Sequence, residues 1–108
     1  MLKLFVKLCF FTNAESSDAL KNDLSTRNII RPAVNFDDGY LFSGTVFVED
    51  RNGWIKLGEQ INVRIDFPTI DMEVYNLICN KLFIGAVYNV QAASKIIGKC
   101  EVISYQYE

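Results

Sequence analysis

The chain of 108 residues contains no histidine, only two prolines and a single tryptophan. Without histidine there is no imidazole for a Ser-His-Asp or Cys-His triad and none to bind a metal. The three cysteines are far apart and form no CxxC pair, and no GxxxxGK[ST] phosphate-binding loop is present. These gaps argue against an enzyme, and we expect a protein with no metal, no cofactor and no small-molecule substrate.

The chain also lacks a basic excess, since its formal net charge is −2. Nonspecific nucleic-acid binding usually depends on such an excess. Residues 37–73 contain eight acidic and three basic side chains. This acidic middle is either a solvated face or a surface that suits a basic partner.

No apolar run approaches the roughly 20 residues that a membrane helix needs. The start MLKLFVKLCFF has the two basic residues of a signal peptide, but Lys7 interrupts its apolar stretch. Alternating leucine, valine and phenylalanine side chains fit a strand better. We therefore expect a cytoplasmic protein that does not contact a membrane.

Hydrophobic residues, by contrast, are plentiful. They make up 50% of the chain and include eight Phe and five Tyr. This composition is typical of one globular domain, covering residues 1–108. We expect Cys9, Cys79 and Cys100 to be reduced and mostly buried in its core.

Alternating or β-branched segments recur along the chain, and turn residues separate them. The predicted strands are residues 2–11, 29–36, 41–48, 61–67, 86–93 and 95–107. In the fourth, Ile61, Val63, Ile65 and Phe67 should point inward, and Asn62, Arg64 and Asp66 outward. Turns are expected at residues 37–39 and 52–53, while residues 12–28 form a long polar loop with one possible helical turn near 18–24.

Residues 69–84 suit either a strand or a short helix. The spacing of Met72, Tyr75 and Cys79 favours a helix, with Thr69 or Asp71 as its N-cap. Several antiparallel strands with short connections predict a small barrel or a sandwich.

The order of several short motifs narrows this choice. They are KLCFFTNAESS, Arg31-Pro32 followed by Val34 and Phe36, Gly58-Glu59 before the strand that Pro68 ends, Gly85 ahead of Tyr88, and the closing KIIGKCEVI. In this order the chain resembles the C-terminal barrel, or third domain, of elongation factor Tu and related translation GTPases. It departs from that family in the longer connection at 69–84, in Leu57 where the family has a proline, and in Cys100 where it has a glycine.

The resemblance implies an all-β fold, a six-stranded antiparallel β-barrel, here without a GTPase domain. In that family the barrel is not catalytic and contacts tRNA, the GTPase domain and exchange factors through its outer surface. The resemblance thus implies a binding domain. We expect a protein partner, for an adaptor, an inhibitor or an immunity-type protein; the alternative is a translation-linked RNA-binding module.

The candidate binding residues are Arg51, Trp54 and Lys56, which follow or flank the Asn52-Gly53 turn. Trp54 is either a recognition anchor, on a protein or stacked on a base, or a plug at one end of the barrel. The paired acids at 37–38 and 49–50 suit a cation or acid–base chemistry, but in turns such residues more often bind backbone amides.

Three residues are expected to have structural roles. Pro32 should begin a strand or lie at a sheet edge, and Gly53 should supply the positive φ of its turn. Gly98 should be a bulge or a close-packing site that lets the final strand bend.

Overall fold

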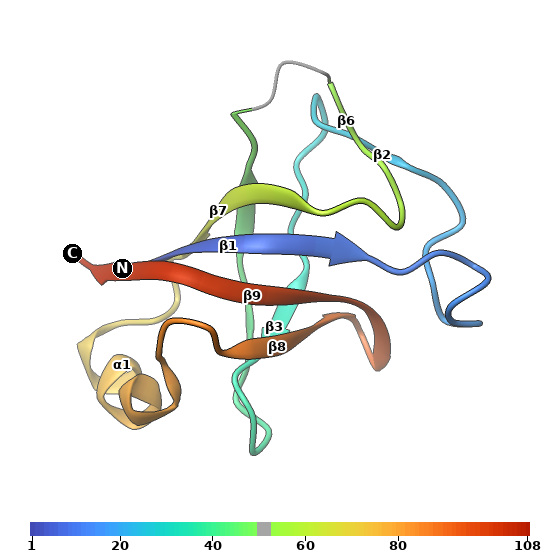
Figure 1. Cartoon of the computed structure of the whole chain (residues 1–108). Helices are drawn as coiled ribbons and strands as arrows, with labels where there is room; N and C mark the ends of the chain where they lie inside the picture. The colour runs from blue at the N-terminus through green and yellow to red at the C-terminus, as the bar shows by residue number, and fades with distance from the viewer. Residues whose placement is uncertain (50–52) are drawn as a thin grey trace.

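The computed structural model describes residues 1–49 and 53–108. Figure 1 shows the chain with most of its elements labelled. The strands are β1 (Leu2–Phe10), β2 (Leu24–Ser25), β3 (Ala33–Asn35), β4 (Leu41–Ser43), β5 (Thr45–Phe47), β6 (Trp54–Ile55), β7 (Ile61–Phe67), β8 (Val87–Ala92) and β9 (Lys95–Tyr107), and the helices are α1 (Met72–Ile78) and the 3-10 helix η1 (Cys79–Lys81).

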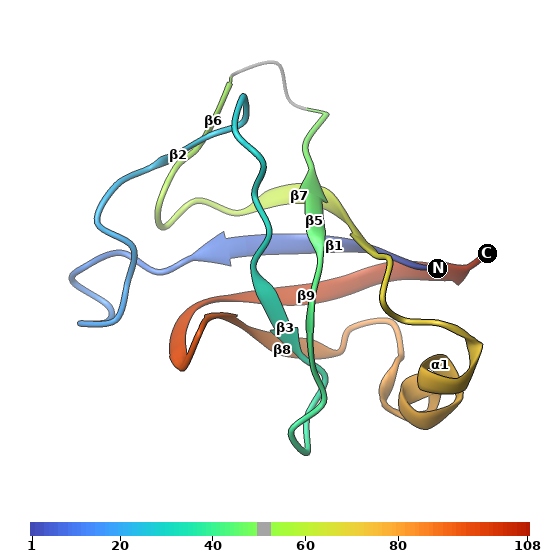
Figure 2. The same cartoon turned by 180° about the vertical axis from the view of Figure 1, so that it is seen from behind.

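Seven strands form one antiparallel sheet in the order β4-β3-β8-β9-β1-β7-β5. Its two end strands are consecutive in the chain, because β4 and β5 are halves of residues 41–47. β4 pairs with β3, and β5 pairs with β7. The pairing with the β3 side continues past β4, since the Gly44 amide donates to Pro32 O at 3.0 Å and the Val46 amide to Ile30 O at 2.9 Å. Residues 41–47 therefore join both ends of the sheet into a nearly closed barrel, which Figure 2 shows from behind.

Gly44 explains why this strand divides into two. A Cβ at this position would collide with the Ile65 side chain and lie 2.7 Å from Phe67 Cε1. The backbone can thus cross close over β7 only because residue 44 has no side chain. If residues 41–47 are counted as one bent strand, the barrel has the six strands that the sequence predicts, and the all-β barrel class is confirmed.

The core follows the alternation of the strands. On β1, every second residue is fully buried: Leu2, Leu4, Val6, Leu8 and Phe10. On β7 the pattern holds less well, because Ile61 is only half-buried and Asp66 is 8% exposed. The interpretation of Asp66 as a solvent-facing residue is therefore wrong.

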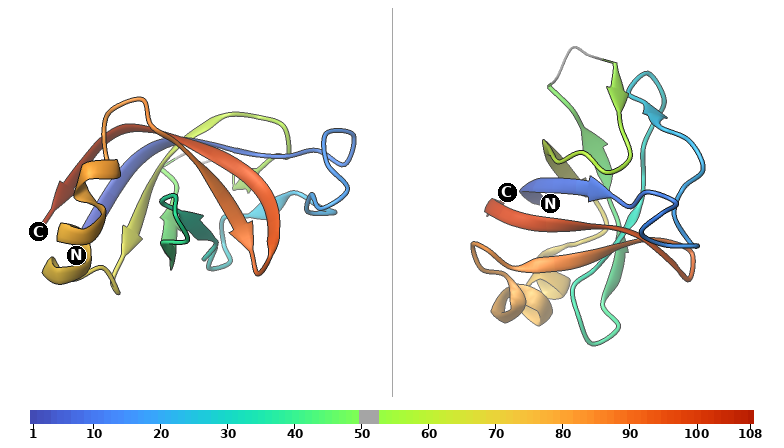
Figure 3. Two further views of the ribbon diagram at one scale, coloured as in Figure 1. Left: turned by 90° about the horizontal axis from the view of Figure 1, so that it is seen from below. Right: turned by 45° about the vertical axis from the view of Figure 1, so that its right-hand side comes forward.

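Residues 69–84 contain the short helix α1, and the strand alternative is excluded. Asp71 is its N-cap, because Asp71 Oδ1 accepts a hydrogen bond from the Val74 amide at 3.0 Å. Ile78 is buried, and two tyrosines hold the end of the connection. The buried Tyr88 donates its hydroxyl hydrogen bond to Lys81 O, and the partly buried Tyr105 donates to Leu82 O. The helix lies beside the two chain ends, as the left view of Figure 3 shows.

The possible helical turn near residues 18–24 is not formed. Instead, Leu24 and Ser25 pair with β6, and the Asp23 carboxylate accepts from the Leu57 amide at 2.9 Å. Side-chain and strand contacts with a distant segment thus override the local helical tendency.

Two further predictions have different outcomes. The turn at residues 37–39 is confirmed, with φ of 72°, 53° and 82° for Asp37, Asp38 and Gly39. The prediction that the cysteines are mostly buried is wrong, because only Cys100 is buried. Cys9 is partly exposed, and Cys79 is exposed. Cys79 follows α1, where the core-facing position is already taken by Ile78.

Candidate interaction surface

Of the predicted binding residues, Trp54 lies in β6 of the short β2–β6 ribbon, and Lys56 follows that strand. Arg51 falls outside the described residues, as does Asn52 of the predicted turn. Gly53 has φ +83° and accepts a hydrogen bond from the Thr26 amide. Trp54 is 51% exposed and Lys56 is exposed, whereas Ile55 between them is buried. Trp54 therefore lies on the surface, and Ile55 is the β6 side chain that enters the core.

The two other structural candidates lie within the barrel wall. Pro32 is buried immediately before β3, and its carbonyl accepts from Gly44. Gly98 is opposite Val90 next to a bulge, because the pairing of β8 and β9 leaves Ile97 as an extra residue. A Cβ on Gly98 would lie 2.5 Å from Cys9 O, so β9 packs closely on the backbone of β1 here.

A concave surface that was not among the sequence predictions lies on the outer face of β5, β7, β1 and β9. It has a volume of about 350 Å³. We call it the outer groove, and its residues are Phe5, Phe47, Glu49, Asn62, Val63, Arg64, Ile103 and Ser104.

A β-bulge brings an aliphatic side chain into the outer groove. Phe5 pairs with Ser104 and Val6 with Val102, so Ile103 is the extra residue on β9. Ile103 is 39% exposed and its neighbour Ser104 is exposed too, although a strictly alternating strand would place only one of these two residues outward. Bulges often redirect a side chain at a functional surface.

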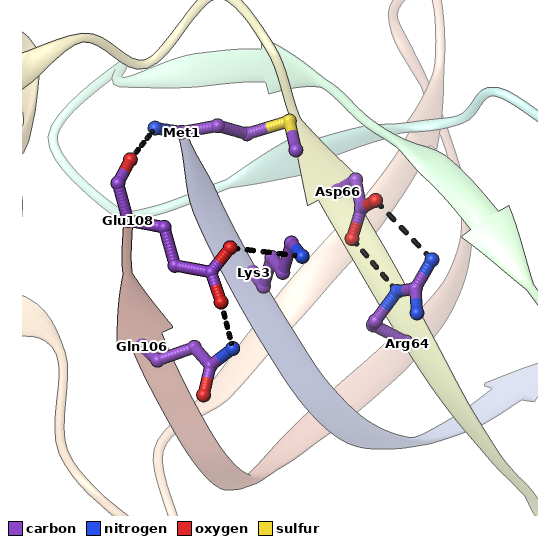
Figure 4. Close-up of polar contacts among 6 residues, drawn as sticks. All are labelled: Met1, Lys3, Arg64, Asp66, Gln106 and Glu108. Atoms are coloured by element: carbon purple, nitrogen blue, oxygen red, sulfur yellow. Dashed lines mark hydrogen bonds and ion pairs between the residues drawn. The ribbon is translucent and has the colours of Figure 1, made fainter.

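Arg64 lies at the centre of the groove. It is the cross-strand neighbour of Phe5 on one side and of Phe47 on the other. Its guanidinium carbon is 4.5 Å from the centroid of the Phe47 ring, which fits a cation–π contact. Its Nε also donates to Asp66 Oδ1 at 2.9 Å, as Figure 4 shows. The Phe47 ring and the Asp66 carboxylate together fix the guanidinium.

Polar contacts border the groove on the side of the chain ends. Lys3 Nζ lies 3.1 Å from Glu108 Oε2, and the amino group of Met1 donates to Glu108 O at 2.6 Å (Figure 4). An apolar and aromatic centre with an arginine and a polar rim is typical of a protein–protein contact surface.

One sequence signal for this surface existed. Phe5 lies at an outward position of β1 between Lys3 and Lys7, where a polar residue is usual. Phe47 alternates with the buried Val46 in the same way. Ile103 gave no signal, because a bulge shifts the alternation by one residue.

Two of the thiols and the paired acids at residues 37–38 are accounted for by their surroundings. Burial raises the pKa of Cys100 to about 12 and, together with the nearby Glu15 charge, raises the pKa of Cys9. A raised pKa keeps these thiols protonated at neutral pH. Asp38 forms an ion pair with Lys81, and the Asp37 amide is bound by Asn35. Within residues 1–49 and 53–108, no three His, Cys, Asp or Glu side chains are grouped as metal ligands.

Comparison with models of protein families gives no match, and comparison with curated proteins gives none either. The resemblance to the third domain of elongation factor Tu thus stays a prediction from the sequence. Across the described part of the chain, no helix has the length and apolar character to cross a membrane.

Proposed function

We propose that this chain is a non-enzymatic protein-binding domain and that the outer groove is its contact surface. The observation that carries the proposal is the bulge at Ile103, which adds an exposed aliphatic side chain to a concave surface already lined by Phe5 and Phe47. Aromatic residues and arginine supply much of the energy at protein interfaces. An adaptor, an inhibitor and an immunity-type protein would each need such a surface.

The exposed apolar area favours a partner with apolar anchors. Phe47 is 44% exposed, and covering it together with Ile103 would stabilise a complex by roughly 25 cal/mol per Å² of apolar surface. Arg64 already pairs with Asp66, so its position changes little when a partner docks. Binding of this kind depends only weakly on salt concentration.

The alternative function is RNA binding, retained from the family that the sequence resembles. One observation favours it: β1 presents Lys3, Phe5 and Lys7 in a line on the outer face. A ring between two lysines suits a stacked base flanked by phosphates. Against it, Lys3 pairs with Glu108, and the whole chain has a net charge of −2.

The test is affinity capture with wild type, with Ile103→Ser and with a control, Leu77→Ser. Leu77 is an exposed leucine on α1 and does not line the groove. A protein that wild type and Leu77→Ser retain but Ile103→Ser loses is identified, purified and titrated by calorimetry at two salt concentrations. We expect Ile103→Ser to bind it at least about tenfold more weakly, with little change between the two salt concentrations.

Two results would contradict the proposal. One is equal affinity of the purified partner for wild type and Ile103→Ser. The other is binding of a labelled single-stranded RNA that falls steeply with salt, which would favour the alternative.

A further inference from the structure

The segment around β2 lies at the opposite end of the barrel from α1 (Figure 1). Another concavity is lined by residues of this segment. We call it the mouth cleft. Three separate parts of the chain form it: the end of β1, residues 20–32, and the hairpin between β8 and β9. Its volume is about 250 Å³, and eight of its eleven lining residues are apolar, among them Phe10, Leu24, Ile30 and Ile97.

The polar residues of the mouth cleft belong to one segment. They are Ser25, Asn28 and Arg31. The backbone between them is held in a turn, because the Asn28 amide donates to Ser25 O at 3.2 Å and the Arg27 amide to Ser25 Oγ at 3.3 Å. Arg31 is the sole charged residue that lines the cleft, and among the described residues it forms no ion pair.

We propose that the mouth cleft binds a short amphiphile with an apolar chain and a carboxylate. The chain lies against Leu24, Ile30 and Ile97, and the carboxylate pairs with Arg31. A guanidinium matches a carboxylate with two parallel hydrogen bonds, and no acidic residue of the cleft competes for it. Openings of β-barrels are frequent ligand sites, and this volume is slightly below the usual range of roughly 300–1,000 Å³ for drug-sized ligands, which suits a short ligand.

Two sources supply this chemistry. One is a free short-chain carboxylic acid, and the other is the C-terminus of a peptide whose last residue is apolar. Both place one carboxylate beside one short apolar group. The site is separate from the outer groove, with which it shares no lining residue.

The single tryptophan gives a built-in reporter. Trp54 pairs across the ribbon with Ser25, which lines the cleft. The experiment titrates the full chain with octanoate and with octanol, and follows Trp54 fluorescence and calorimetric heat. A tetrapeptide ending in leucine, as free acid and as amide, represents the second source.

The matched variants are Arg31→Gln and Arg27→Gln. Both arginines are exposed and lie in the same segment, but only Arg31 lines the cleft. We expect saturable binding of octanoate or of the free-acid peptide, at least about tenfold weaker binding of the matching alcohol or amide, and the same loss for Arg31→Gln. Arg27→Gln and the groove variant Ile103→Ser should bind like wild type.

The stronger of the two acidic probes identifies the source. The proposal is overturned if neither acid binds saturably, if octanol binds as tightly as octanoate, or if Arg27→Gln weakens binding as much as Arg31→Gln. A negative result for the mouth cleft does not affect the proposal for the outer groove, because Ile103→Ser tests that site separately.

Discussion

Replacing Gly98 with alanine adds one methyl group at the closest approach of β9 to β1. The new Cβ would lie 2.5 Å from Cys9 O and 3.1 Å from Phe10 Cα. Both are backbone atoms of β1, so no side chain can rotate away. The two strands must separate, and the Phe11 amide, which donates to Ile97 O at 2.9 Å, loses its geometry.

The size of the effect follows from two opposing terms. At an unstrained site, glycine to alanine stabilises a protein by roughly 0.4–1 kcal/mol because the unfolded chain loses freedom. Overpacking at a site that cannot relax destabilises by roughly 1–3 kcal/mol. Since the neighbours here are backbone, the second term should dominate, and we expect a net loss of about 1–2 kcal/mol for Gly98→Ala. Gly98→Val should cost at least as much.

The assay is urea unfolding followed by circular dichroism, with a thermal melt as a second readout. Lys99→Ala is the control, because Lys99 is the exposed neighbour of Gly98 on β9. It should unfold at nearly the wild-type urea concentration. If Gly98→Ala is as stable as wild type or more stable, the close packing of β9 on β1 is not what requires glycine here.

Three further predictions test other contacts. Arg64→Ala should lower the free energy of unfolding by roughly 1–2 kcal/mol, because it leaves the carboxylate of Asp66, which is 8% exposed, without its partner. In chemical denaturation, the double variant Arg64→Ala/Asp66→Ala should recover part of this loss. A wild-type denaturation midpoint for Arg64→Ala would refute the prediction. Burial raises the pKa of Tyr88 and of Cys100, each to about 12, so their contribution to stability is complete below pH 9.0 and is lost as the pH rises through the folded pKa. Urea midpoints between pH 9.0 and 12 should therefore fall, less steeply for Tyr88→Phe, and a flat profile would contradict this. Trp54, 51% exposed, should be quenched by iodide in the native state, and an unquenched indole would show that it is buried.

Much of the fold could be predicted from the sequence because alternation along a strand reports which face is buried. The strict pattern of β1 from Leu2 to Phe10 and the N-cap at Asp71 are local signals, and both appear in the structure. The division of residues 41–47 into two strands at Gly44 could be predicted only in part. A glycine in a strand suggests a bend, but only the positions of Ile65 and Phe67 show that the chain crosses close over β7 there.

The candidate sites were harder to predict, because they depend on pairing between distant segments. The bulge at Ile103 exists only in the register of β9 against β1, and the mouth cleft needs three segments to meet. The prediction that Asp66 faces solvent was wrong for the same reason. Alternation correctly gives its direction along β7, but the strands beside it, β1 and β5, place Lys3 and Thr45 opposite it.

Amide chemical-shift mapping shows directly whether the outer groove binds a protein. The ¹⁵N-labelled chain is titrated with the purified partner, and the affected resonances are placed on the structure. We expect the largest shifts at Phe5, Phe47, Arg64 and Ile103, with α1 unaffected. Shifts concentrated on α1 or on the β2–β6 ribbon, with the four groove residues unchanged, would contradict it.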